Sequence, residues 1–255
     1  KSARTEQGES YAAAMATTDT FRSLHDDGTF VMPNPWDRGS VKLLEELGFP
    51  ALATTSAGFA RSIGKSDQQV TRDELVAHVA DLTAFAAVPL NVDSERLFPD
   101  EPGGIGESVR LLADAGAAGC SIEDYDPARR AIVPIDEATR AVRAAAEACA
   151  AHGVVLTARA ENHLYGGTDL DDTIERLIAY RDAGAEVLYA PLLLEASDID
   201  RVVREVGAPI NVLGVPGTPS VAELRDLGVR RVSTGGLLQS VAYGEARRVA
   251  SEYLV

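Results

Sequence analysis

Cysteine, methionine and tryptophan are scarce in this chain of 255 residues, which has two cysteines, two methionines and one tryptophan. Cys120 and Cys149 are too few to form the disulfide framework of a small secreted protein. No apolar run approaches the ~20 residues of a membrane-spanning helix, and residues 1–14 lack the apolar stretch of a secretion signal. These absences favour a reducing, cytoplasmic setting and argue against a membrane partner.

Positive charge is also in short supply. Lysine and arginine number 24 against 39 aspartates and glutamates, which gives a formal net charge of −15. Such a charge repels nucleic-acid backbones and anionic membrane surfaces, so neither is an expected partner. It also repels an acidic substrate. An anionic ligand therefore needs a local positive group, such as a metal ion or an arginine.

One pattern recurs along the chain: a helical stretch, then a glycine, then a short run of β-branched or small apolar residues. A glycine just after a helix supplies a left-handed cap, and the apolar run reads as a strand buried on both faces. The pattern occurs at residues 47–55, 115–124, 152–161, 183–191, 206–214 and 227–235. Residues 30–34 and 88–93 bring the number of expected strands to eight.

Eight strands alternating with helices predict a single (β/α)8 barrel, of the TIM type, over residues 21–255. Residues 1–20 are expected to be an N-terminal extension, tag remnant or lead-in. Capping boxes at Thr71 with Glu74 and at Ser220 with Glu223 predict two helix starts. An open doubly wound sheet is the alternative, disfavoured because no G-x-G-x-x-G follows the first strand.

In a parallel barrel the active site lies at the carboxyl ends of the strands, and polar residues follow most of the predicted strands. Because side chains alternate along a strand, Glu123 should face the interior with Ser121, while Cys120 packs against the helices. The same alternation points Asp93 inward with Asn91, and Arg159 inward with Thr157. The strand-end residues are Asn34, Trp36, Asp37, Ser56, Ala57, Gly58, Asp93, Glu95, Glu123, Asp124, Arg159, Glu161, Asn211, Thr234, Gly235 and Gly236.

Carboxylates at neighbouring strand ends lie close enough to share one hard cation, which favours Mg²⁺ over zinc. They could instead be solvated residues of the rim. Arg159 is either a clamp for a substrate carboxylate or phosphoryl group, or a partner of Glu161 or Glu123. Trp36 is either a core residue or a lid over a flat substrate.

Several segments together resemble the isocitrate lyase and phosphoenolpyruvate mutase superfamily, from about Phe21 to the C-terminus. They are FVMPNPWDRGS, ATTSAGFA, RDEL, NVDSE, GCSIED, LTARAE and NVLGVPGTPSVAELRDLGVRRVSTG. The resemblance implies a Mg²⁺-dependent barrel, with Mn²⁺ as a substitute, that cleaves or forms C–C or P–C bonds beside a 2-oxo acid. It also implies a homo-oligomer, a tetramer or dimer, in which the C-terminal helix within residues 237–255 is exchanged between subunits.

The resemblance also implies roles for individual residues. The expected metal ligands are Asp93, Glu95 and Glu123. The expected catalytic residues are Arg159, Glu123 and Asp67. The substrate, a small anionic 2-oxo acid or carboxylate, is expected to contact Trp36, Ser56, Ala57, Gly58, Arg159 and Asn211.

Two departures from the superfamily pattern bear on the reaction. The lyases carry Lys-Lys-Cys-Gly-His in the loop after the fourth strand, and the phosphonopyruvate branch carries a Lys and an Asn there. Here the loop reads DYDPARRAIVPIDE, in which only Arg129 and Arg130 could replace the lost charge. The usual Asp-x-Asp with a glycine-rich turn is replaced by Asp93, Ser94 and Glu95 followed by RLFPD.

The favoured hypothesis is a lyase or decarboxylase that cleaves a C–C bond of a small 2-oxo acid through an enolate-like intermediate. The alternatives are P–C bond chemistry, of the phosphoenolpyruvate mutase or phosphonopyruvate hydrolase type, and a non-catalytic 2-oxo acid binding protein. A further alternative takes Thr234, Gly235 and Gly236 as a phosphate cradle.

Overall fold

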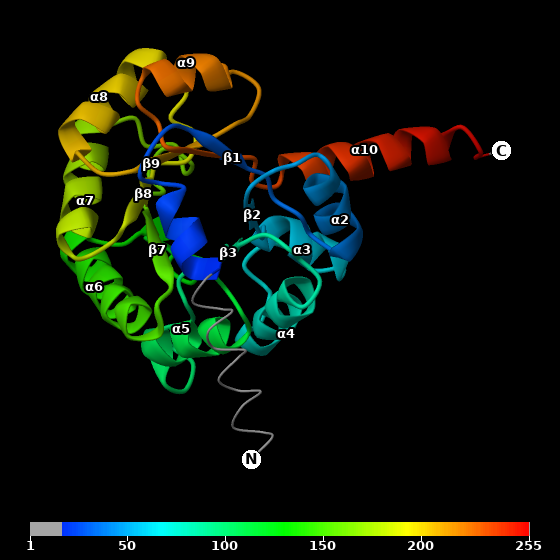
Figure 1. Ribbon diagram of the computed structural model, residues 1–255, viewed down its shortest axis with the longest axis horizontal. Helices are drawn as coiled ribbons and strands as arrows, with labels where there is room; N and C mark the ends of the chain where they lie inside the picture. The colour runs from blue at the N-terminus through cyan, green and yellow to red at the C-terminus, as the bar shows by residue number, and fades with distance from the viewer. Residues whose placement is uncertain (1–16, 255) are drawn as a thin grey trace.

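The computed structural model describes residues 17–254, and the expectation for residues 1–16 lies outside them. Eight parallel strands follow one another around a barrel in chain order, with helices outside them (Figure 1). The predicted single (β/α)8 barrel is confirmed. Its strands are β1 (Phe30–Met32), β2 (Leu52–Ala53), β3 (Leu90–Val92), β4 (Gly119–Glu123), β7 (Val155–Arg159), β8 (Val187–Tyr189), β9 (Ile210–Leu213) and β10 (Arg231–Ser233).

Hydrogen-bonded ladders join every neighbouring pair of strands except β1 and β2. At that position the Ala53 N–H donates to the Pro33 carbonyl at 3.0 Å. The Asn34 amide adds a second bond, from Nδ2 to the Thr54 carbonyl at 2.7 Å. Pro33 and Pro35 have no N–H to give, so β1 cannot extend a ladder toward β2. One backbone bond and one side chain therefore link these two strands.

The helices begin and end largely where the sequence predicted. Both predicted capping boxes are present, and Asp37 with Ser40 forms a third. Gly153 and Gly207 adopt the left-handed conformation that ends a helix before the next strand. Residues 17–23 are helical. The helices after β1 are α2 (Arg38–Glu46), α3 (Ser56–Ser62), α4 (Arg72–Thr83), α5 (Gly104–Asp114), α6 (Ile135–His152), α7 (Leu170–Asp182), α8 (Ala196–Val206), α9 (Val221–Asp226) and α10 (Leu237–Ser251).

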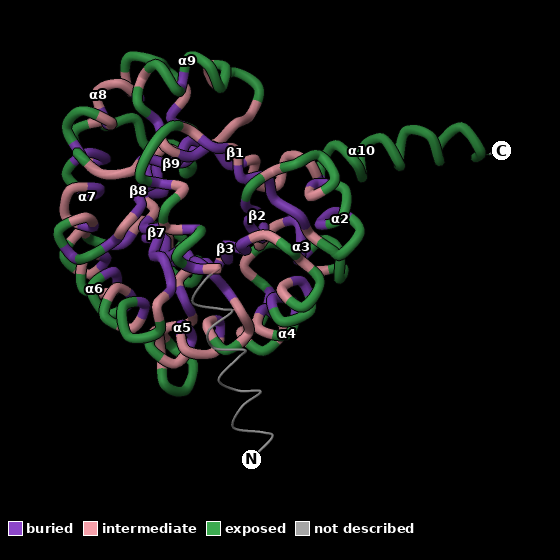
Figure 2. Tube along the Cα trace, in the orientation of Figure 1, coloured by how far each residue is buried: buried purple, intermediate pink, exposed green. Residues whose placement is uncertain are grey.

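Two apolar layers hold the barrel together, and Figure 2 shows burial concentrated along the strands. The larger layer lies between strands and helices and includes Cys120, as predicted from alternation. Cys120 and Cys149 are buried free thiols. The smaller layer fills the interior of the barrel with Phe21, Phe30, Met32, Ala51, Ala53, Ala118, Val155 and Val187. Within residues 17–254, none of the helices combines the length and apolarity that crossing a bilayer requires.

The last helix, α10, leaves the barrel and projects outward (Figure 1). Arg61 of α3 fixes its start by donating to Gln239 Oε1 at 3.2 Å and to Ser240 Oγ at 3.0 Å. Beyond that point α10 and the residues after it expose large apolar side chains at Val241, Tyr243, Val249, Tyr253 and Leu254. Within this chain, the apolar side chains of α10 therefore stay largely exposed.

Candidate active site

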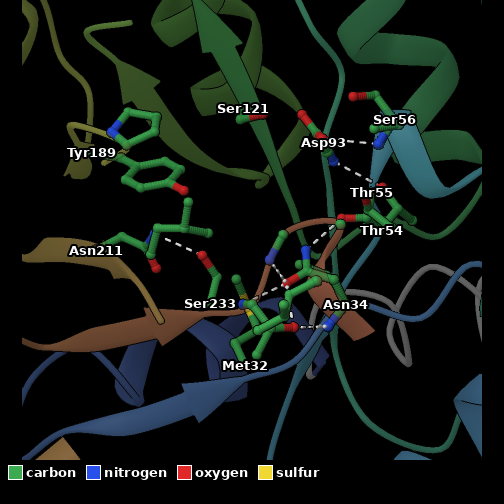
Figure 3. A pocket seen from close by; sticks show the side chains of 18 of the residues that line it. Met32, Asn34, Thr54, Thr55, Ser56, Asp93, Ser121, Tyr189, Asn211 and Ser233 are labelled. Carbon is green, nitrogen blue, oxygen red and sulfur yellow. Dashed lines mark hydrogen bonds between the residues drawn. The ribbon is translucent and has the colours of Figure 1, made fainter. Parts of the chain in front are cut away.

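A cavity of about 350 Å³ opens at the carboxyl ends of the strands, where the sequence placed the active site. In Figure 3, Asp93 and Ser56 lie on one side of it, and Asn211 and Ser233 lie on another. Arg159 and Tyr189 also line the cavity. The cavity thus joins residues from β2 through β10 that lie far apart in the sequence. Of the predicted site residues, those lining it are Ser56, Ala57, Asp67, Asp93, Arg159 and Asn211.

Asp93, at the end of β3, is held from several sides. Its backbone N–H donates to Thr54 Oγ1 at 2.8 Å, which fixes the strand end against β2. The Ser56 N–H donates to one carboxylate oxygen at 2.9 Å. Arg159 Nη1 donates to the other oxygen at 2.7 Å. The carboxylate is therefore oriented at the wall of the cavity, where its side chain is 19% exposed.

Arg159, at the end of β7, contacts three carboxylates. Its Nε lies 2.7 Å from Glu161 Oε1, and its Nη2 lies 3.3 Å from Glu123 Oε2. The pair with Asp93 completes the set, and the guanidinium also lies over the Tyr189 ring at 5.4 Å. Arg159 is thus both a partner of nearby acids and a cation at the cavity. The pairing with Glu161 and Glu123 that the sequence allowed is therefore present, and the clamp for a substrate group stays a prediction.

Acidic groups outnumber Arg159 at this end of the barrel. The carboxylate cluster consists of Asp67, Asp93, Glu95, Glu123 and Glu161. Burial, with the nearby Asp93, raises the pKa of Glu95 to about 8. Burial also raises the pKa of Glu123 well above its usual range, and it raises the pKa of Asp67. One guanidinium cannot neutralise this cluster, so it favours either bound protons or a further cation.

The chemistry of the cluster suits a hard divalent cation. All its donors are carboxylate oxygens, the ligands that Mg²⁺ prefers. Glu95 Oε1 is buried and has no hydrogen-bond partner, so it is an acceptor available to a cation. Within residues 17–254, no three acidic, histidine or cysteine side chains are arranged to hold a metal ion together. Arg159 explains this spacing, because it lies between Asp93, Glu123 and Glu161.

Four of the predicted site residues do not line the cavity. Glu95 lines a second, separate cavity together with Gln68. Glu123 accepts from Gln68 Nε2 at 3.0 Å and pairs with Arg159. Gly58 lies in the first turn of α3 and donates its N–H to the Thr55 side chain at 3.2 Å. Trp36 packs edge to face against Tyr243 of α10, with ring centroids 6.5 Å apart. Trp36 therefore supports the base of α10 in this structure.

Two amides of the turn after β10 are bonded within the protein instead of facing a ligand. The N–H groups of Thr234 and Gly235 both donate to Asn34 Oδ1 at 2.9 Å. Asn34 thereby ties β10 to β1 and, through its Nδ2, to β2. Two of the three backbone donors that the phosphate-cradle alternative would use are therefore bonded inside the protein. The position of Asn34 between two prolines at a strand end was the only sequence signal for this role.

The loop after β4 forms a small antiparallel hairpin of β5 (Tyr125–Asp126) and β6 (Ala131–Ile132). Arg129 pairs with Asp126 at 3.2 Å and with Glu137 at 2.8 Å, so its charge is used within the hairpin region. Neither Arg129 nor Arg130 lines the cavity. The hairpin thus supplies no positive group in place of the lysines that the loop lacks.

Two cavity residues, Tyr189 and Arg231, were not singled out from the sequence. Tyr189 ends β8 within an apolar run, where an aromatic residue reads as core. Arg231 begins β10 as the second of two consecutive arginines, and only the strand register decides which of them faces inward. Alternation carried from Ser233 would have identified Arg231 as the inward one.

Comparisons with known proteins agree with this architecture. A family model described as phosphoenolpyruvate phosphomutase matches residues 21–254. A crystal structure from Burkholderia cenocepacia J2315, described as that of a candidate lyase/mutase, is 48% identical. It has a TM-score of 0.90 and covers 94% of this chain and 88% of its own.

Two enzymes are also similar in sequence. The 2-methylisocitrate lyase of Escherichia coli K12 is 31% identical over 73% of this chain and 67% of its own length. The oxaloacetate decarboxylase of Rhodopseudomonas palustris CGA009 is 30% identical over 77% of this chain and 69% of its own length. The chain therefore belongs to the phosphoenolpyruvate phosphomutase family, within the isocitrate lyase and phosphoenolpyruvate mutase superfamily.

Proposed function

We propose that this chain is an enzyme that cleaves a C–C bond of a small 2-oxo acid, as a lyase or decarboxylase dependent on Mg²⁺. The observation that carries the proposal is the pairing of Asp93 with Arg159 at a cavity on the carboxyl end of the barrel. An anionic ligand at this cavity meets a fixed guanidinium, and a cation meets an oriented carboxylate. The similarity to a lyase and a decarboxylase supports the same chemistry.

The metal would be held by Asp93, Glu95 and Glu123. When bound, Mg²⁺ would polarise the 2-oxo group and stabilise the negative charge that develops as the bond breaks. Mn²⁺, which takes the same oxygen ligands, is expected to replace it.

The chain's own residues would orient the substrate and carry its proton. Arg159 would hold a substrate carboxylate, and Ser56, Ala57 and Asn211 would fix its position within the cavity. Asp67 hydrogen-bonds the Ser56 hydroxyl, and burial raises its pKa. It lines the cavity and can therefore hold or release a proton at its carboxyl oxygen.

The charge balance around Arg159 favours C–C cleavage over P–C chemistry. A phosphonate carries up to two negative charges and needs several positive groups around it. Arg159 is already surrounded by three carboxylates, and Arg129 pairs within its hairpin. A carboxylate group carries a single negative charge and therefore needs fewer positive groups than a phosphonate does.

We expect the purified chain with Mg²⁺ to turn over at least one member of a panel of oxaloacetate, substituted malates and other 2-oxo acids. The reason is that the cavity combines an anion clamp with an oxygen-rich cation site. Mass spectrometry of the products, with and without EDTA, measures this turnover. Turnover of phosphonopyruvate alone would move the assignment to P–C chemistry. Metal-dependent binding without product, measured by calorimetry, would indicate a binding protein instead.

We also expect the chain to be a tetramer or dimer in solution, with α10 packed on a neighbouring subunit. The exposed apolar side chains of α10 and its projection from the barrel support this proposal. Sedimentation equilibrium at micromolar concentration measures the mass, and a monomer would contradict the expectation. Val241→Asp, at a side chain 60% exposed, should shift the population toward monomer. The matched change Ala222→Asp, on exposed α9, should not.

A further inference from the structure

Arg231 is a charged side chain enclosed by the barrel. It begins β10 and is 1% exposed, which makes it the largest of the fully buried side chains. Its neighbour Arg230 faces outward, where it is partly exposed near Asp27. Burying a cation costs several kcal/mol unless an anion compensates it. The partners of Arg231 therefore decide what this position is for.

All the partners of Arg231 within the described residues are neutral. Its Nε donates to Asn211 Oδ1 at 2.8 Å, and its Nη2 donates to Thr157 Oγ1 at 2.9 Å. Its Nη1 lies 3.3 Å from His25 Nε2. His25 Nδ1 lies 3.0 Å from the Phe21 carbonyl and so carries the proton, which leaves Nε2 as an acceptor. No carboxylate of residues 17–254 forms an ion pair with this guanidinium.

His25 does not compete with Arg231 for charge. Burial and the nearby Arg231 lower the pKa of His25 to about 3, so the imidazole is neutral at physiological pH. Burial lowers the pKa of Arg231 only to about 9, so the guanidinium remains charged. The interior of the barrel thus holds one net positive charge where Arg231 and His25 meet.

The Arg231 guanidinium also has hydrogen-bond donors that are not used. It carries five N–H groups, and three of them have the partners just described. One N–H on Nη1 and one on Nη2 remain without an acceptor among the described residues. Arg231 lines the cavity together with Thr157, Asn211 and Ser233. The residue that carries these two donors therefore lines a space that a small molecule can enter.

The position of Arg231 is deeper than that of Arg159. Thr157, which accepts from Arg231, precedes Arg159 by two residues on β7, and both side chains face inward. Two residues of a strand span roughly 7 Å. The cavity consequently has one guanidinium at its mouth, surrounded by carboxylates, and a second one at its floor, surrounded by neutral groups.

We infer that Arg231, positioned by Asn211 and Thr157, is an anion-binding subsite at the floor of the cavity, and that it takes a carboxylate group or an ion of similar size. The anion comes either from the far end of the substrate or from solution. If the anion is a carboxylate of the substrate, the inference rests on the proposed function. Its test requires neither metal nor turnover, so the two can fail separately.

Calorimetry on the full chain without metal, in chloride-free buffer, compares succinate with butyrate, which has the same length but one carboxylate. We expect Arg231→Gln to weaken succinate binding by about 10-fold to 100-fold, the loss of a hydrogen bond to a charged group. Butyrate binding should change less than about twofold, because its single carboxylate is held at Arg159. Arg230→Gln, the matched control, should leave both ligands unaffected.

A second pattern would also support the subsite. If Arg231→Gln leaves succinate binding intact but abolishes the stabilisation of the chain by chloride in thermal melts, the subsite takes a free ion. If the variant folds and neither ligand is affected, the inference is wrong. If it does not fold, crystals of the unaltered chain soaked in bromide decide the matter. An anomalous peak beside the Arg231 guanidinium supports the subsite, and the lack of a peak there overturns it.

Discussion

Replacement of Asp93 by Asn is expected to lower metal-dependent turnover by about a thousandfold, the scale of losing a preorganised charge at the reacting centre. Asn keeps the size of the side chain and can still accept from the Ser56 N–H, which now bonds the carboxylate at 2.9 Å. It removes the negative charge that would hold the cation. The fold should survive, because Arg159 retains Glu123 and Glu161 as partners.

Turnover and Mg²⁺ affinity are measured side by side for this variant, with circular dichroism to verify folding. Asp27→Asn is the matched control, because Asp27 is fully exposed on the loop before β1 and its Oδ1 accepts from Gly28, a bond that Asn preserves. If the Asp93→Asn variant keeps turnover within tenfold of the unaltered chain, with the same requirement for Mg²⁺, Asp93 is not a metal ligand.

Gly119→Ala is expected to cost about 2–3 kcal/mol of folding free energy, the scale of overpacking a core. A Cβ at this position of β4 would lie 2.5 Å from Asn91 Oδ1 and 2.7 Å from Phe21 Cε1. It would also lie 3.1 Å from the Val155 carbonyl, which belongs to the neighbouring strand. Phe21 is completely buried, and the backbone of β7 is fixed by its ladders, so neither can move aside cheaply.

Urea denaturation compares this variant with Gly106→Ala. Gly106 lies within α5, and a Cβ there would meet nothing within 4 Å. Its replacement should stabilise the chain by about 0.5–1 kcal/mol, because alanine loses less entropy in a helix. If the two variants have equal free energies of unfolding, the close packing around Gly119 does not limit stability.

The sequence was sufficient for the barrel and for the direction of most side chains. The eight strands could be located because each follows a glycine and a helical stretch, as at Gly153 before β7. Alternation then placed Ser121, Asp93 and Arg159 on the inner face, where they line the cavity. Both inferences depend on local geometry, which the order of residues determines directly.

Contacts between residues that lie far apart in the sequence could not be predicted from it. Asn34 meets Thr234 and Gly235 only because the barrel closes, and 200 or more residues separate them. Trp36 meets Tyr243 only because α10 starts beside α3. The spacing of the carboxylates around Arg159 depends on how four side chains share limited space. Periodicity gives the face on which a residue lies but does not give its partner.

The weak link between β1 and β2 has a mechanical consequence. Ladders bind β2 to β3 on one side, whereas toward β1 it has one backbone bond and the Asn34 side chain. The barrel therefore has a seam, and that seam runs along the wall of the cavity. Ser56 and Ala57 follow β2, while Arg231 and Ser233 belong to β10, beyond β1. Widening the seam would separate these two walls without breaking a ladder, and the bond from Asn34 to the Thr54 carbonyl opposes that separation.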